Sequence, residues 1–139
     1  MQATMGDKLI NGEEILFRQI HPNSLESGEP GSDRFRPTLS DKNMLSTDRS
    51  SLTTAAASHA LYTSTGRLSA AVFGLSVSEF ECETIACFED PINKSEPEPE
   101  NLAHALANYS LHGEKAQKLV AKRLKRLAVA RGCLLQSAT

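Results

Sequence analysis

The chain has 139 residues, a length that suits one domain and leaves little room for a second. Its 15 Lys and Arg nearly balance 17 Asp and Glu, and the net charge of −2 argues against a uniformly basic nucleic-acid-binding coat. Leu, Ile, Val and Phe make up 31 residues, which suffice only for a thin core. This composition excludes a membrane protein, a coiled coil, a collagen-like chain and a disulfide scaffold, and it indicates a small soluble domain.

The N-terminal half combines one clear strand with a long irregular stretch. Residues 1–13 are expected to form a flexible lead-in, followed by a strand over residues 15–20 that ends before Pro22. Residues 21–53 are rich in Ser, Thr, Pro and Gly, so we expect a long loop with a short extended piece at residues 34–38. Such a stretch inside a compact domain is usually a functional loop, or it contains a helix or strand that the sequence pattern does not reveal.

The middle of the chain alternates helix and strand signals. Thr53 is a plausible N-cap for a helix that Gly66 would terminate. Residues 69–77 form the clearest strand, where Gly74 indicates that another part of the chain approaches the backbone closely. One short helical turn is expected after Ser78. Residues 79–100 carry eight acidic side chains and three prolines, which predict an acidic extended loop.

The C-terminal part contains the most regular element. Residues 101–109 are ambiguous between helix and strand, and their position favours a strand. A helix is predicted from about Gly113 to Arg131, ended by Gly132, with a short closing strand at 133–135. We therefore expect one α+β domain over residues 14–136: a small, mostly antiparallel sheet, two main helices packed on one face and a long irregular N-terminal loop.

Charge is distributed unevenly along the chain. Residues 114–131 have a net charge of +6, so the rest of the chain sums to −8. The simpler interpretation is a solvated helix face whose lysines pair with the acidic loops, and the alternative is an anion-binding face for nucleic acid. The residues of this face are Lys115, Lys118, Lys122, Lys125 and Arg126.

A second basic cluster lies in the N-terminal half. If residues 34–38 are extended, Arg34 and Arg36 point the same way, and two guanidinium groups side by side suit a phosphate or a carboxylate. The alternative is that these arginines form ion pairs with nearby acidic residues. The candidate binding residues are Arg18, His21, Arg34, Arg36, Asp41 and Arg49.

Acid–base and metal chemistry have weaker signals. His21 or His104, together with an Asp such as Asp41 or Asp48, is a candidate catalytic pair, with His59 and His112 as further candidate bases. A Cys₃His zinc site would need Cys82, Cys87 and Cys133 with His104 or His112, but the usual CxxC knuckle is missing. We therefore expect cysteines that act as small hydrophobic residues, with no metal and no cofactor.

Several motifs resemble a group of small bacterial proteins of uncharacterised function. They are FRQIHP (17–22), FRPT (35–38), Asp41 with LSTDRSSLT (45–53), VFGLSVSEF (72–80), AHA (103–105) and RGCL (131–134). The resemblance runs from about residue 15 to residue 135 and carries over no catalytic residue. It implies a bacterial, cytoplasmic single domain, which agrees with three unpaired thiols and with Glu13 and Glu14 interrupting any secretion signal.

These features favour a binding module over an enzyme. The first hypothesis is an accessory protein that binds a macromolecular partner, a co-encoded protein, through the arginine-bearing segment 21–53. The second is an enzyme acting on a phosphate- or carboxylate-bearing small molecule, with Arg18, His21, Arg34 and Arg36 lining the pocket. The third is nucleic-acid binding by the basic helix, and no contact with a membrane is expected.

Overall fold

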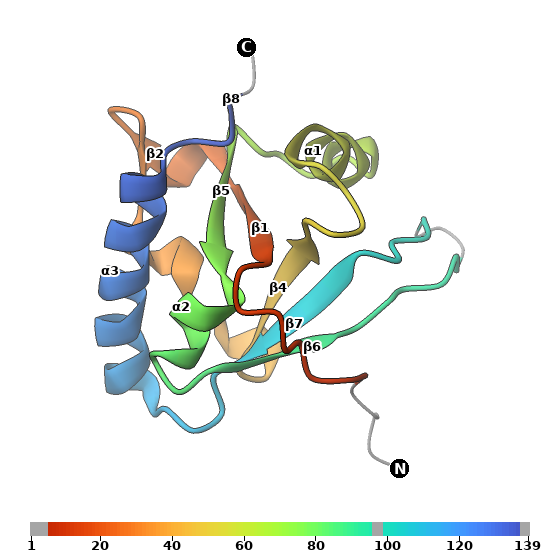
Figure 1. Cartoon of the computed structure of the whole chain (residues 1–139). Helices are drawn as coiled ribbons and strands as arrows, with labels where there is room; N and C mark the ends of the chain where they lie inside the picture. Colours follow the sequence, from red (N-terminus) through yellow and green to blue (C-terminus); the bar gives the residue numbers. More distant parts are fainter. Residues whose placement is uncertain (1–5, 96–98, 137–139) are drawn as a thin grey trace.

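The computed structural model describes residues 6–95 and 99–136. A six-stranded antiparallel sheet in the order β6-β7-β4-β1-β5-β8 forms its centre (Figure 1). The strands are β1 (Ile15–Ile20), β4 (Met44–Arg49), β5 (Ala71–Ser76), β6 (Ala86–Glu89), β7 (His104–Asn108) and β8 (Leu135–Gln136). A separate hairpin pairs β2 (Leu25–Glu26) with β3 (Glu29–Pro30). The helices are α1 (Ala55–Ser64), α2 (Val77–Glu81) and α3 (Glu114–Arg131).

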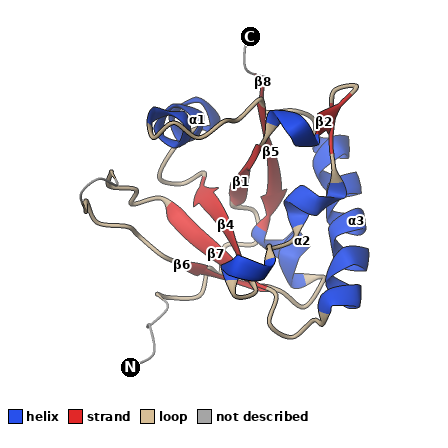
Figure 2. Cartoon of the chain, turned by 180° about the vertical axis from the view of Figure 1, so that it is seen from behind, coloured by secondary structure: helices blue, strands red, loops and turns tan. Residues whose placement is uncertain are grey.

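The two longer helices cover opposite faces of the sheet. Helix α3 buries Val120 and Leu124 in the same core cluster as Leu16 and Ile20 of β1. Helix α1 lies on the other face, where Gln19 of β1 donates a hydrogen bond to Ser58. Figures 1 and 2 show the two helices on either side of the strands. The α+β class with an antiparallel sheet is confirmed, but the helices are not on one face as expected.

The polar character of α1 explains why it packs on the face of the sheet opposite the apolar core. Ser58 is its only buried residue, and the side chain donates to Asp48 of β4 at 2.6 Å while accepting from Gln19 at 2.9 Å. Such a helix adds little apolar surface to a core, so it docks through hydrogen bonds. The apolar core consequently lies on the α3 side of the sheet.

The segment after the β2–β3 hairpin packs against β1 beyond the point where β1 and β4 stop pairing. Only two residue pairs join these strands, Leu16 with Arg49 and Phe17 with Asp48. Beyond them the 3₁₀ helix η2 (Ser32–Phe35) packs against β1 and α3. Phe35 is fully buried there, and the hydroxyl of Tyr109 donates to its carbonyl oxygen. The N-terminal segment is therefore tied into the core through η2.

The expected long loop at 21–53 is more regular than its composition suggests. It contains η1 (Pro22–Ser24), the β2–β3 hairpin, η2, η3 (Leu39–Asp41) and the central strand β4. Residues 34–38 are not one extended piece, because η2 continues to Phe35 and extended backbone begins at Arg36. The acidic stretch likewise contains α2 and β6, and its residues 96–98 lie outside the described part of the chain.

Other sequence expectations are confirmed. The strand at 15–20, the strand within 69–77, the strand reading of 101–109 and the long C-terminal helix are all present. At Gly74 an added Cβ would lie 2.6 Å from Ile15 Cγ2 and 2.7 Å from Leu134 Cδ1, so the chain does approach this backbone closely.

Within the expected lead-in, the amide of Leu9 donates to the Cys87 carbonyl and its side chain is buried. No helix within the described residues is long and apolar enough to cross a bilayer.

Candidate functional site

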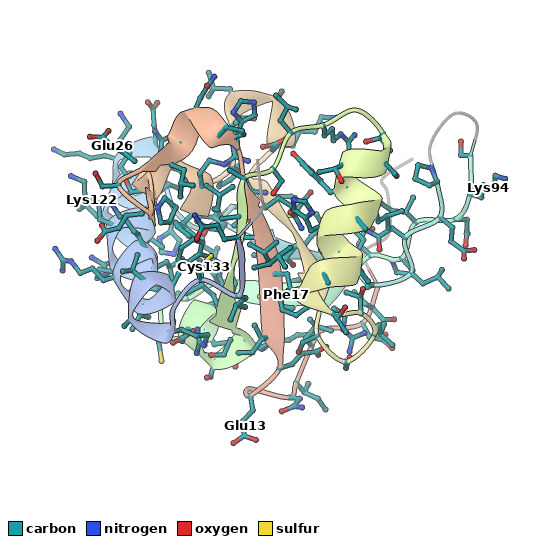
Figure 3. All side chains as sticks on the ribbon, turned by 90° about the horizontal axis from the view of Figure 1, so that it is seen from above. Glu13, Phe17, Glu26, Lys94, Lys122 and Cys133 are labelled. Carbon is teal, nitrogen blue, oxygen red and sulfur yellow. The ribbon has the colours of Figure 1, made fainter. Side chains whose placement is uncertain are left out.

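An open cleft of about 680 Å³ lies on the α1 side of the sheet, and we call it the arginine cleft. Its floor includes Phe17 of β1, Asp48 of β4 and His104 of β7, which follow one another across the three adjacent strands. Tyr62 of α1 lines one side. The connection between β6 and β7 lines the other through Asn101. Figure 3 shows α1 beside the strand that carries Phe17, with the connection that carries Lys94 farther out.

Two arginines reach one end of this cleft through the gap between β1 and β4. Arg18 donates from Nε to the Arg34 carbonyl at 2.6 Å and from Nη1 to the Ser46 carbonyl at 3.1 Å. Arg34 comes from η2 and donates from Nη2 to the Gln19 carbonyl at 3.5 Å. Both side chains line the cleft. The 3₁₀ helix η2, which buries Phe35 in the core, therefore also places Arg34 next to Arg18.

Neither guanidinium group forms an ion pair with a described carboxylate, although the negative charge of nearby Asp41 acts to raise the pKa of Arg18. Within the described chain, neither has a carboxylate oxygen within ion-pair distance, and Nε of Arg34 is buried without a hydrogen-bond partner. Burial, followed by the positive charge of Arg34, lowers the pKa of Arg18 to about 10, so it keeps its charge at neutral pH. Both side chains are half-buried, and charges withdrawn from water are normally compensated, because desolvation is costly. An anion in the cleft would supply this compensation.

The two carboxylates that line the cleft have local partners. Asp48 accepts from Ser58 at 2.6 Å and from Asn101 at 2.9 Å. Asp41 accepts from the backbone and the hydroxyl of Thr38, both at 2.8 Å. These carboxylates therefore hold α1, the β6–β7 connection and η3 in place, and neither forms an ion pair with Arg18 or Arg34.

His104 enters the cleft with one ring nitrogen already engaged. Its Nδ1 lies 2.9 Å from Asp90 Oδ2 and 3.1 Å from the Asp90 carbonyl oxygen. Because both are acceptors, Nδ1 carries a hydrogen, and in the neutral ring Nε2 keeps its lone pair. No described residue forms a hydrogen bond with Nε2, and the side chain is 13% exposed. This geometry is that of a histidine oriented by a carboxylate.

The far wall of the cleft is less polar. Leu61 and Tyr62 of α1 contribute to it, and the Arg67 guanidinium lies 5.5 Å from the centre of the Tyr62 ring, while Ile92 adds apolar surface on the side of the β6–β7 connection. A stacked cation and ring of this kind leaves apolar surface beside positive charge. The cleft can thus hold a ligand with an anionic end and an organic remainder.

The other members of the N-terminal cluster lie elsewhere. His21 accepts a hydrogen bond from the Asn23 amide and caps η1, and neither it nor Arg36 lines the cleft. Arg49 pairs with buried Glu14 at 3.1 Å. Burial by itself raises the pKa of Glu14, but hydrogen bonds from Arg49 and Ser51 outweigh it and lower the pKa below its ordinary value of 4.5. Of the six candidate binding residues, Arg18, Arg34 and Asp41 share the cleft.

The basic face of α3 is partly neutralised by acidic residues. Lys118 lies 3.7 Å from Glu114, and Lys125 lies 3.8 Å from Glu29. Arg123 and Arg131, on the same helix, pair with Glu83 and Glu79 at 2.7 Å. Lys115, Lys122 and Arg126 are exposed and have no ion pair within the described part of the chain. Figure 3 shows Lys122 and Glu26 at this surface.

The cysteines and the other histidines do not form a common site. Cys87 is buried, which raises the pKa of its thiol to about 12, whereas Cys82 and Cys133 are exposed. His59 and His112 bond through Nε2 to backbone carbonyls, at 2.9 and 2.7 Å. Over residues 6–95 and 99–136, no group of three His, Cys, Asp or Glu is arranged to hold a metal ion.

Among the cleft side chains that sequence reasoning missed are Tyr62, Arg67 and Asn101. Tyr62, Arg67 and Asn101 belong to α1, the turn after it and the β6–β7 connection. None of them stands in a motif, so only the tertiary arrangement identifies them. No family model, curated protein or solved structure matches the chain.

Proposed function

We propose that the arginine cleft binds a small organic anion, whose phosphate or carboxylate group lies against Arg18 and Arg34. The observation that supports this most directly is the pair of adjacent guanidinium groups without a carboxylate partner in the described chain. A phosphate or carboxylate accepts charge-assisted hydrogen bonds from such groups and relieves their mutual repulsion.

The shape of the cleft supports a small molecule as the ligand. A volume of about 680 Å³ falls within the range of about 300–1,000 Å³ that small-molecule sites occupy. The apolar side around Leu61 and Tyr62 accommodates the organic part of the ligand. The hydrogen bonds from Ser58 and Asn101 to Asp48 keep the walls in place before binding, and such preorganisation lowers the entropic cost of association.

The test is calorimetric titration and thermal denaturation with sodium phosphate and with sodium succinate, at an ionic strength matched with chloride. At least one anion should raise the melting temperature and bind with a Kd of about 1 mM or below. Arg34→Gln should weaken binding about tenfold or more. Arg36→Gln is the matched control, since it removes the same charge two residues away and outside the cleft. Equal affinities of the two variants, or no binding of either anion, would contradict the proposal.

A second proposal concerns the outer surface of segment 21–53, which we suggest binds a co-encoded protein. Leu39 of η3 is 96% exposed there, and an apolar side chain at that exposure is available to a partner. Leu39→Ser should weaken the complex formed by the two purified proteins. Ile10→Ser is the control, because Ile10 is 89% exposed but lies outside the segment. Equal losses would point to non-specific apolar contact and against this segment.

A further inference from the structure

His104 is the one histidine in the described chain whose free ring nitrogen belongs to the arginine cleft. Its Nδ1 hydrogen is held by the carboxylate and the carbonyl of Asp90, which fixes both the ring orientation and the tautomer. In this tautomer the neutral ring presents Nε2 with a lone pair, the state that a general base requires. In contrast, His59 and His112 engage Nε2 with backbone carbonyls, and His21 lies outside the cleft.

The register of the sheet brings His104 near the two guanidinium groups. Arg18 contacts the Ser46 carbonyl in β4, and Asp48, two residues farther along that strand, lies opposite His104 in β7. One strand spacing and two residues along a strand combine to about 8 Å between the Cα atoms of Ser46 and His104. The side chains of Arg18, Arg34 and His104 all line the arginine cleft.

We propose that the arginine cleft hydrolyses phosphate monoesters, with His104 as the general base and Asp90 as its positioning residue. The proposal rests on the anion-binding function proposed above and adds a reaction to it. Two guanidinium groups carry two positive charges, which match the charge of nearly −2 on a phosphate monoester at neutral pH. A carboxylate would neutralise only one of them, so phosphate is the better match.

The reaction balances with water as the only co-reactant. Nε2 of His104 takes a proton from water while the water oxygen bonds to phosphorus, and the bond from phosphorus to the alcohol oxygen breaks. The leaving oxygen gains a proton from solvent, and His104 returns its proton to solvent. The products are the alcohol and inorganic phosphate, and no oxidation state changes. Arg18 and Arg34 stabilise the charge on the phosphoryl oxygens during this transfer.

The neighbouring side chains leave His104 as the available base. Asp48 faces His104 from β4 but accepts hydrogen bonds through both carboxylate oxygens. Asp41 is bonded to Thr38. The aromatic or aliphatic part of the leaving alcohol would pack against the apolar surface of Tyr62.

The experiment measures hydrolysis of para-nitrophenyl phosphate by the full chain. His104→Gln should lower kcat about 100-fold or more while phosphate affinity, measured by calorimetry, stays within about threefold. Asp90→Asn should lower kcat about tenfold with little change in KM, because the amide no longer selects the same tautomer. Arg34→Gln should raise KM. His21→Gln is the matched control and should leave both constants unchanged.

The pH profile separates a base from a structural residue. A histidine base gives a kcat that rises with pH between about 5 and 8, and this rise should disappear in His104→Gln. Turnover that survives His104→Gln with the same pH profile overturns the role of His104. If His104→Gln does not fold, Asp90→Asn provides the same test, and an unchanged kcat in it overturns the pairing.

The binding measurement distinguishes the two proposals. If phosphate binds and Arg34→Gln abolishes that binding, but para-nitrophenyl phosphate is not hydrolysed, the hydrolytic proposal fails and the anion-binding function stands. If phosphate and succinate both fail to bind, both proposals fail together. Hydrolysis that Arg34→Gln leaves unaffected also overturns the hydrolytic proposal, because it locates the reaction outside the cleft.

Discussion

The two ends of the β1–β4 strand pair carry arginines in opposite electrostatic situations. At one end, Arg49 donates to both carboxylate oxygens of Glu14, and Ser51 adds a backbone and a side-chain hydrogen bond. At the other end, Arg18 and Arg34 donate to carbonyl oxygens alone, and no described carboxylate pairs with them. At the first end the buried Glu14 carboxylate has an ion-pair partner, whereas at the second end two guanidinium groups have none among the described residues.

This difference follows from how the strands separate. The strands pair at Leu16 with Arg49 and at Phe17 with Asp48, which brings Glu14 and Arg49 together at the closed end. Past that point η2 packs against β1, and the backbone carbonyls of Arg34, Ser46 and Gln19 accept from the two arginines in place of acidic side chains. The closed end therefore stabilises the fold, whereas the open end is suited to a ligand. Variants at the two ends should differ in the sign of their effect on stability.

The largest effect is expected at the closed end. Arg49→Ala removes the ion-pair partner of Glu14, whose side chain is only 3% exposed, and leaves a buried carboxylate with hydrogen bonds from Ser51 but no counter-charge from Arg49. The free energy of unfolding should fall by about 3 kcal/mol in urea denaturation. Arg36→Ala, which removes an arginine outside any described ion pair, should change it by less than about 0.5 kcal/mol. Similar losses in both variants would show that Glu14 does not depend on Arg49.

Acidic pH should also lower the free energy of unfolding through the Glu14–Arg49 pair, by less than the loss expected for Arg49→Ala. Because the hydrogen bonds lower the pKa of Glu14 in the folded chain, its contribution is present above pH 4.5 and is lost as the pH falls below that value. The stability difference between the wild type and Glu14→Gln should therefore shrink as unfolding is measured from neutral to acidic pH. A difference that stays constant across this range contradicts the assignment.

An intermediate effect is expected where η2 is attached to the sheet. Tyr109→Phe leaves the Phe35 carbonyl without its donor and should cost about 1.5 kcal/mol of unfolding free energy. Since η2 also carries Arg34, phosphate affinity should fall severalfold in the same variant. If stability falls while phosphate affinity is unchanged, the packing of Phe35 alone positions Arg34.

The smallest effect, and the opposite sign, is expected at the open end. Arg34→Met removes one of two repelling charges and a buried Nε that lacks a partner, so the free energy of unfolding should stay within about 0.5 kcal/mol of the wild type or rise. The increase in melting temperature that phosphate produces should disappear. A loss of more than about 1.5 kcal/mol would mean that Arg34 is a structural residue like Arg49.

The sequence by itself determined the elements whose pattern is local. The alternation over residues 15–20 and 69–77 and the helical spacing over 114–131 repeat along the chain, and each corresponds to an observed element. Strand β4 escaped detection because polar Thr47 and Arg49 follow Leu45 on the core face, so the apolar alternation stops after one residue. Likewise, a single 3₁₀ turn changed the relation between Arg34 and Arg36.

Only the tertiary structure decided which charged residues meet. The sequence named Arg18, Arg34 and Asp41 as candidates and weighed His104 as a base, but it could not separate them from His21, Arg36 and Arg49. Arg18 and His104 are brought together by the pairing of β1 with β4 and of β4 with β7. Periodicity depends on neighbouring residues, whereas a site depends on strand register and on where two strands part, and these follow from hydrogen bonds between distant segments.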